Sequence, residues 1–250
     1  MIESMANQIN LKRLELIQSN ISRYGLHINL VSAKTSPRYA YTIGLFTKIG
    51  AELILAGAIF YNADEVKRII NEIAVTLKTE ADLNQRKIEV GELGSFTLKE
   101  VDVSWSNDLM LGVADFYKEK NIRAFQIFPD IPNWTIDVPD LSLPWSEVSA
   151  PAWKWLHAPW PYLIPADAIA VTNLAALHGE FITEAARWEE DQWELYAGSS
   201  ENLTKADVRI VPIGTLLAID TSLKAVVDLG VGHAIWRDPK VFQWHVWEKK

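Results

Sequence analysis

The sequence predicts an α+β fold: two α+β domains with mixed or antiparallel sheets, joined by an ordered segment rich in proline and tryptophan. Segments with helical apolar spacing are interspersed with short alternating or β-branched segments along the whole chain. The 250 residues suffice for one large domain or two small ones. Eight of the 11 prolines and five of the 11 tryptophans lie within residues 129–165, and this segment separates two groups of predicted elements.

The first group opens with a helix. Apolar residues recur at helical spacing over 11–21, and Gly25 is typical of a helix end. Alternation at 28–30 and the aromatic and β-branched residues of 39–45 predict two strands. The apolar run 52–60 fits either a strand or a buried helix, because periodicity does not separate the two for a short run.

The clearest helix of the chain covers residues 62–77. Asn62 is a suitable N-cap, with a glutamate at the third helical position and one apolar face. A strand over 96–105 follows, and we expect Ser106 to cap the next helix. Residues 122–128 read as a further strand, which a Pro-Asp pair ends.

The proline- and tryptophan-rich segment is predicted to be ordered, because a flexible linker is usually rich in glycine and serine and has no tryptophan. We place the domains at 1–160 and 161–250. The indoles of this segment either form an exposed recognition surface or close the core between the domains. The candidate residues for binding a partner here are Trp134, Trp153, Trp155 and Trp160.

The second group of elements contains mainly strands. An acidic turn, Glu189-Glu190-Asp191, joins two of them, and we interpret it either as a solvated turn or as a contact for a partner. Thr221 or Ser222 caps a short helix that Gly230 ends. The predicted strands cover 168–172, 181–189, 192–197 and 208–212, followed by a closing hairpin of 233–237 and 241–247.

The composition excludes several classes of function. The net charge of −8 is spread along the chain without a basic stripe, which argues against nucleic-acid binding and against adhesion to an anionic membrane. The absence of cysteine excludes disulfides and thiol nucleophiles. The first 20 residues lack the apolar core of a signal peptide, so we expect a cytoplasmic location.

No catalytic constellation is recognisable in the sequence. The five histidines have no metal-ligand spacing, and phosphate-binding glycine loops and nucleophile elbows are absent. We therefore predict no catalytic residue, no metal and no cofactor, and the sequence favours a protein that is not an enzyme.

One polar and aromatic cluster is a candidate ligand site. Arg38 at the start of the strand 39–45 could hold an anion at the end of a pocket. The alternative is a strand whose tyrosines pack on the core with their hydroxyls hydrogen-bonded. The candidate ligand-binding residues are Arg38, Tyr39, Tyr41, Thr42, Gln126 and Asp130.

Two resemblances add to this reading. Residues from about 24 to 145 resemble an uncharacterised bacterial domain family with a YTxGL signature, which here is the run Tyr41-Thr42-Ile43-Gly44-Leu45. Glu52-Leu53, the later Gln126 and Pro129-Asp130 also match, whereas Gly50-Ala51 stands where the family has His-Pro. The family implies no established reaction.

The second resemblance concerns residues from about 166 to 247. They are similar to a small α+β family among the immunity proteins of bacterial polymorphic toxin systems, through Asp191-Gln192-Trp193-Glu194-Leu195, a strand region from Ile210 to Leu217, and Asp220 before a Ser-Leu helix. Together the resemblances imply a non-enzymatic immunity protein that binds and neutralises a toxin. The alternative is a small-molecule-binding or enzymatic domain with its pocket at the strand 39–45.

Overall fold

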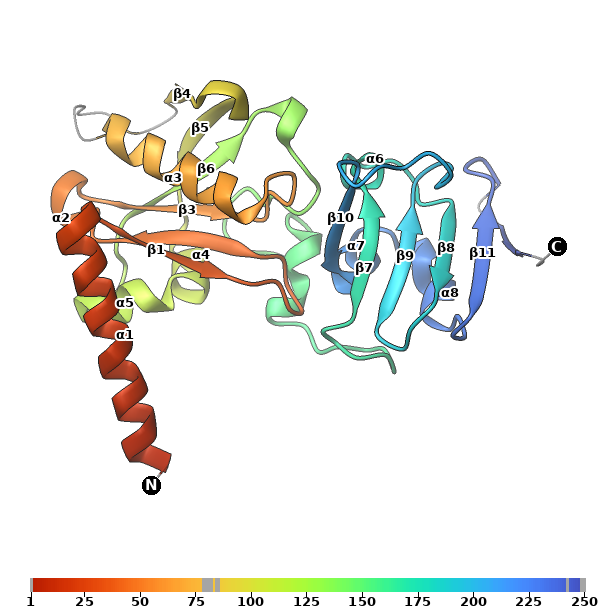
Figure 1. The fold of residues 1–250 in the computed structure, drawn as a ribbon, viewed down its shortest axis with the longest axis horizontal. Helices are drawn as coiled ribbons and strands as arrows, with labels where there is room; N and C mark the ends of the chain where they lie inside the picture. The colour runs from red at the N-terminus through yellow and green to blue at the C-terminus, as the bar shows by residue number, and fades with distance from the viewer. Residues whose placement is uncertain (1, 78–82, 84–85, 242, 248–250) are drawn as a thin grey trace.

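The computed structural model of the chain describes residues 2–77, 83, 86–241 and 243–247. It contains two mixed six-stranded sheets that lie side by side, with helices packed on them, which confirms the predicted α+β fold (Figure 1). No helix within these described ranges is long and apolar enough to cross a membrane.

Sheet A has the strand order β1-β2-β3-β6-β5-β4, and its only parallel pairing joins β3 and β6. Its strands are β1 (His27–Val31), β2 (Tyr39–Ile43), β3 (Glu52–Ala56), β4 (Lys87–Glu89), β5 (Ser95–Glu100) and β6 (Ala124–Pro129). The helices of this part are α1 (Ile2–Tyr24), α2 (Phe46–Ile49), α3 (Ala63–Leu77), α4 (Val103–Leu109) and α5 (Leu111–Tyr117), with short 3₁₀ helices η1 (Gly91–Leu93) and η2 (Ile131–Asn133).

Helices cover both faces of sheet A. The side chains of Leu53 and Leu55 pack with α3, whereas those of Ile54 and Ala56 pack with α4 and α5 on the other face. The ambiguous apolar run 52–60 therefore contains a strand that is buried on both faces, and such strands lack polar alternation.

Sheet B has the order β10-β7-β9-β8-β11-β12, with one parallel pairing between β7 and β9. Its strands are β7 (Ile169–Asn173), β8 (Glu184–Arg187), β9 (Gln192–Tyr196), β10 (Val208–Pro212), β11 (His233–Arg237) and β12 (Trp244–Val246). The helices here are α6 (Leu174–Leu177), α7 (Ile213–Ile219), η4 (Thr221–Leu223) and α8 (Lys224–Val227).

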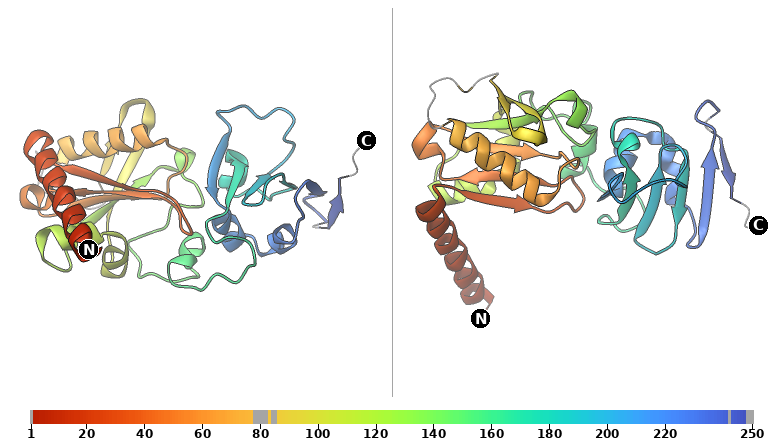
Figure 2. Two further views of the ribbon diagram at one scale, coloured as in Figure 1. Left: turned by 60° about the horizontal axis from the view of Figure 1, so that its bottom comes forward. Right: turned by 45° about the horizontal axis from the view of Figure 1, so that its top comes forward.

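Sheet B is covered by α7 and α8 on one face only. Trp193 and Leu195 of β9 and Ile235 of β11 point to this inner face and pack with apolar residues of the two helices. The opposite face, which we call the open face, therefore carries the alternate residues of each strand. In both Figures 1 and 2, β11 lies at the side of sheet B that is farther from sheet A.

The segment between the sheets is ordered and contains the 3₁₀ helix η3 (Pro151–Leu156). Trp153 belongs to the core beside sheet A, and the indole N–H of Trp155 donates to the Gly214 carbonyl of α7 at 2.8 Å. Trp160 packs on the core of sheet B and contacts the Trp155 ring, with 5.0 Å between ring centroids. Buried indoles therefore hold this proline-rich chain in place.

A second contact links the two sheets through Arg209 of β10. Its guanidinium Nε donates to the carbonyls of Ile59 and Phe60, at 3.1 and 3.2 Å, and its Nη2 donates to Phe60 at 2.9 Å. These carbonyls lie in the loop after β3, so sheet B contacts sheet A at the carboxyl end of its central strand.

Several sequence predictions need correction. The strand predicted over 96–105 ends at Glu100, and Trp105 lies in α4, because the Asp102 carboxylate accepts from the Ser104 N–H and caps a helix there instead of Ser106. Asp220, not Thr221 or Ser222, is the N-cap of the short helix η4. The region expected as a strand up to Leu217 turns into α7 after Pro212, and β4 and α6 were not predicted.

Candidate binding site

The YTIGL segment is organised around a buried carboxylate. Glu52 is fully buried, and its oxygens accept from the backbone N–H groups of Gly44 at 2.8 Å and Phe46 at 3.0 Å. The hydroxyls of Thr42 and Tyr117 donate to it at 2.6 and 2.7 Å. All of these donors belong to the chain itself, so Thr42, Gly44 and Glu52 support the fold and leave no open anion site.

The other candidates near this strand are also held by the scaffold. The Tyr41 hydroxyl accepts from the Asn29 amide at 2.7 Å, and the Tyr39 ring stacks at 6.2 Å from the Tyr41 ring. The Arg38 guanidinium donates to the carbonyls of Ala58 and Tyr61. Burial lowers the pKa of this guanidinium.

Gln126 and Asp130 lie apart from that cluster. The Gln126 amide is fully buried, donates to the Pro139 carbonyl at 2.7 Å and accepts from the Leu141 N–H at 2.9 Å. Asp130 follows β6, and one of its buried carboxylate oxygens has no hydrogen-bond partner among the described residues. The six candidate ligand residues do not share one set of partners. The side chains of Tyr41, Thr42 and Gln126 hydrogen-bond to separate parts of the scaffold, and Nε of Arg38, like the Asp130 oxygen, is buried without a partner among the described residues.

The four tryptophans predicted as a partner surface are mainly part of the core. Trp153 is fully buried and Trp155 nearly so, Trp160 is partly buried, and Trp134 packs at the edge of the core beside sheet A. They close the cores and the junction, which is the alternative that the sequence left open. The acidic residues of the turn between β8 and β9, in contrast, are exposed: Glu189, Glu190 and Asp191.

A cluster of exposed aromatic side chains lies on and beside the open face of sheet B. Cross-strand pairing aligns Tyr196 of β9 with Glu184 of β8, and Glu184 with Trp236 of β11. Directly paired residues point to the same face, so these three side chains form one row. On β12, His245 continues the row, with its ring 4.9 Å from the Trp236 ring.

A second row contains small residues at its centre. Glu194 pairs with Ala186, and Ala186 with Ala234. Trp247 extends this row, since its backbone N–H donates to the Ala234 carbonyl at 2.9 Å. Two alanines between longer neighbours leave a depression in the sheet surface, and large side chains stand around it.

The depression is one of two adjoining cavities. One has a volume of 520 Å³, with Ala186 and Ala234 in its lining and Trp188 at its rim. The other has a volume of 740 Å³, and both are lined by Glu184 and Trp247. The two cavities adjoin at these residues, and we call them together the aromatic groove, which follows β8, β11 and the end of β12.

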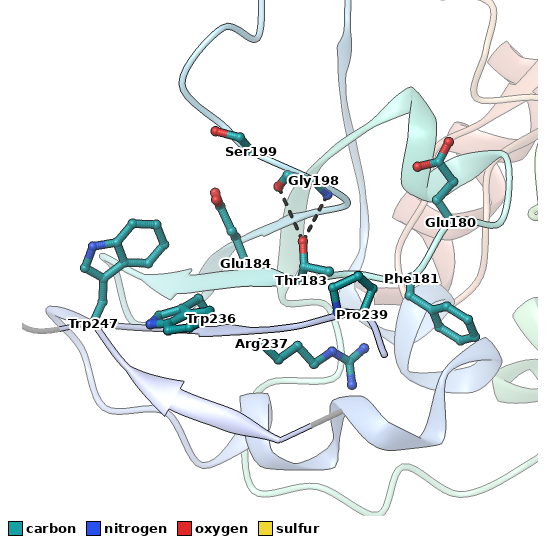
Figure 3. Close-up of a pocket in the computed structure, with 10 residues that line it drawn as sticks. All are labelled: Glu180, Phe181, Thr183, Glu184, Gly198, Ser199, Trp236, Arg237, Pro239 and Trp247. Atoms are coloured by element: carbon teal, nitrogen blue, oxygen red, sulfur yellow. Dashed lines mark hydrogen bonds between the residues drawn. The ribbon is translucent and has the colours of Figure 1, made fainter. Parts of the chain in front are cut away.

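The side chains of the groove are accessible to a partner. Trp188, Trp236 and Trp247 are 46%, 43% and 49% exposed. Figure 3 shows Trp236 beside Trp247, with Glu184 lying between Trp236 and Ser199 of the following loop. Ser200 in that loop donates its backbone N–H to the Glu184 carboxylate at 3.0 Å, so the loop forms one wall of the groove.

The charge of the groove is negative. Burial raises the pKa of Tyr196, and the neighbouring carboxylates of Glu194 and Glu184 raise it further. Neither carboxylate forms an ion pair with any residue that the structure describes. Arg237 also contacts the groove, but its buried guanidinium pairs with Asp220 at 2.9 Å and is neutralised there.

The groove is lined by aromatic rings, alanines and carboxylates. Within the described part of the chain, no three histidine or acidic side chains are grouped so that they could hold a metal ion.

Sequence reasoning singled out the acidic turn beside Trp188 but missed the groove itself. The signal was present in the strand alternation of 184–188 and 234–236, which places Glu184, Ala186 and Trp188 on one face together with Ala234 and Trp236.

Comparison with known proteins gives one match. Residues 20–132 match a family described as a domain of unknown function (DUF4262), a range that contains all six strands of sheet A and the whole YTIGL segment. No curated protein and no solved structure matches the chain. The matched range ends before sheet B, so the resemblance of residues 166–247 to immunity proteins receives no support from these comparisons. Over residues 20–132 the chain is therefore similar to a family of unknown function.

Proposed function

We propose that this protein is a non-enzymatic immunity protein that binds and neutralises a bacterial toxin, and that the partner docks on the aromatic groove of sheet B. The observation that carries the proposal is the presence of three half-exposed tryptophans around one acidic groove. Tryptophan is enriched among the residues that dominate binding energy at protein interfaces, and burying such rings against a partner removes apolar surface from water.

The charge of the chain supports a basic partner. The net charge is −8, and the groove and the neighbouring turn contribute Glu184, Glu194, Glu189, Glu190 and Asp191. An acidic surface accelerates the encounter with a basic protein and disfavours acidic competitors. Toxins that act on nucleic acids carry such basic surfaces, because they must approach phosphates.

The alternative function, a small-molecule or enzymatic pocket at the strand 39–45, has weaker support. Thr42 and Gln126 are fully buried and hydrogen-bonded within the scaffold, so a ligand would have to displace internal partners to reach them. The aromatic groove needs no such rearrangement.

The proposal is tested by co-expression with toxin genes that lie next to the gene of this protein. We expect the wild-type chain to restore growth and to form a 1:1 complex with one of these toxins. The double variant W188A/W236A should fail to restore growth while keeping its thermal stability. The control V75A alters an exposed apolar side chain on α3 and should protect as well as the wild type. Full protection by the double variant would contradict the assignment of the groove.

A further inference from the structure

The smaller cavity of the aromatic groove has the composition of a site for an organic cation. Its floor is made by Ala186 and Ala234, whose short side chains leave a recess in the sheet. Around the recess stand the rings of Trp188, Tyr196 and Trp247. Aromatic faces attract cations because the ring quadrupole places negative potential above the ring.

Two carboxylates complete the lining of this recess. Glu184 lies two residues before Ala186 on the same face of β8 and pairs with Tyr196 of β9. Glu194 of β9 pairs directly with Ala186. Both are partly buried, and neither has a described cationic partner. A carboxylate in a partly desolvated site is stabilised by an opposite charge within a few ångströms. The recess therefore offers negative charge and aromatic faces to the same small volume.

The inner face of the same sheet contains two cation–π contacts. There the Arg187 guanidinium lies 4.3 Å from the centre of the Trp193 ring, and the Arg237 guanidinium lies 4.4 Å from the centre of the Trp244 ring. On the open face the aromatic rings and carboxylates are present, and among the residues that the structure describes no arginine or lysine lines the smaller cavity, which His233 also borders. Such a lining suits a cation that a partner supplies.

We propose that the recess between Trp188, Tyr196 and Trp247 binds one lysine or arginine side chain of a protein partner, as the anchor of a segment that lies along the aromatic groove. The inference rests on the proposed function, because it takes the partner to be a protein. A protein segment is favoured over a free amine because the 740 Å³ cavity continues the recess past Glu184 and Trp247 and would be left empty by a small cation.

The test uses a pentapeptide with one central lysine between glycines, acetylated and amidated, and a matched peptide with norleucine at the centre. Binding is followed by NMR of the indole N–H signals, assigned with tryptophan-to-phenylalanine variants. We expect the lysine peptide to shift the signals of Trp188 and Trp247 saturably. The norleucine peptide should bind about tenfold more weakly or not at all, since it lacks the charge.

Variants identify the charge partners. E184Q/E194Q should weaken the lysine peptide by about tenfold or more, whereas the control E189Q, on the adjacent turn, should change the affinity less than about twofold. Butylammonium should bind more weakly than the peptide, and equal binding would show a site for free amines. Equal affinity of the norleucine peptide, or an unchanged affinity of E184Q/E194Q, would overturn the cation site. Neither result affects the growth test with W188A/W236A, which examines the proposed function. Failure of the cation site and failure of the proposed function are therefore distinguishable.

Discussion

The Glu52 carboxylate accepts a hydrogen bond from the Gly44 backbone N–H at 2.8 Å, and this contact joins the start of β3 to the loop that follows β2. Gly44 has a φ of 111°, and a Cβ at this position would lie 2.8 Å from the Ile21 side chain of α1. The Gly of the YTIGL run is therefore required both for its backbone angle and for the close approach of α1. The range that matches a family of unknown function thus includes this contact, which holds β2, β3 and α1 together.

Replacing the buried carboxylate should destabilise the protein. We expect E52Q to lower the free energy of unfolding by about 2–4 kcal/mol, because an amide N–H₂ would then face backbone donors in the core. Urea unfolding measures the effect. The control E72Q removes an exposed ion pair with Arg68 on α3 and should cost less than about 1 kcal/mol. Equal losses in the two variants would contradict the role of Glu52.

Two glycines with similar backbone angles allow the cost of backbone strain to be separated from the cost of steric overlap with an added Cβ. Gly57 and Gly50 have φ values of 69° and 74°, so alanine is strained at both positions. A Cβ at Gly57 would overlap the Asp137 carbonyl oxygen, whereas a Cβ at Gly50 would meet nothing within 4 Å. We expect G50A to cost about 1–2 kcal/mol and G57A at least about 2 kcal/mol more, measured by thermal unfolding.

The contribution of the α4 N-cap to the free energy of unfolding should depend on pH. Hydrogen bonds from the backbone N–H and the hydroxyl of Ser104 lower the pKa of Asp102. Because the folded value lies below the unfolded one, the contribution is present above the unfolded pKa and is lost as pH falls through the folded value. D102A should therefore cost about 1 kcal/mol at pH 7, and the difference from wild type should shrink below about pH 4.

The matched control for this cap is Ser106, the residue that the sequence suggested. S106A should change stability by less than about 0.5 kcal/mol, because its hydroxyl only donates to the Val103 carbonyl on the helix surface. A larger loss for S106A than for D102A would contradict the observed helix start.

The junction between the sheets depends on Arg209. R209A removes donors to the carbonyls of Ile59 and Phe60, and we expect a loss of about 1–3 kcal/mol in the free energy of unfolding. R123A, which breaks an exposed pair with Glu100, should cost less than about 1 kcal/mol. An R209A variant as stable as R123A would show that the junction is held by apolar contacts alone.

Local signals predicted most of the fold correctly. The helix 62–77 is observed as α3, with the Asn62 side chain accepting from the Glu65 N–H at 3.0 Å and the Glu65 carboxylate accepting from the Asn62 N–H at 2.7 Å. The strands around the acidic turn and the closing hairpin were also predicted. The strand predicted over 96–105 was too long because Val101 and Val103 continue a β-like pattern. Asp102, which lies between them, instead caps the helix that starts at Val103.

The candidate sites were harder to predict because they depend on register. Exposed and buried tryptophans have the same local sequence signal, and only the pairing of Glu184 with Trp236 and of Ala186 with Ala234 brings the groove together. Arg38 and Thr42, which the sequence suggests as ligand-binding residues, donate to internal oxygens through Nη2 and the hydroxyl group. Those partners lie on other strands and loops, so no local pattern could reveal them.

We propose that the aromatic groove of sheet B binds a toxin partner. The most direct measurement is calorimetric titration of the wild type and of W188A/W236A with the toxin that the co-expression experiment identifies. Our account predicts a 1:1 complex whose affinity falls at least about 100-fold in the double variant, because two interface tryptophans are removed. An affinity that is unchanged in the double variant would contradict the claim and place the interface elsewhere on the protein.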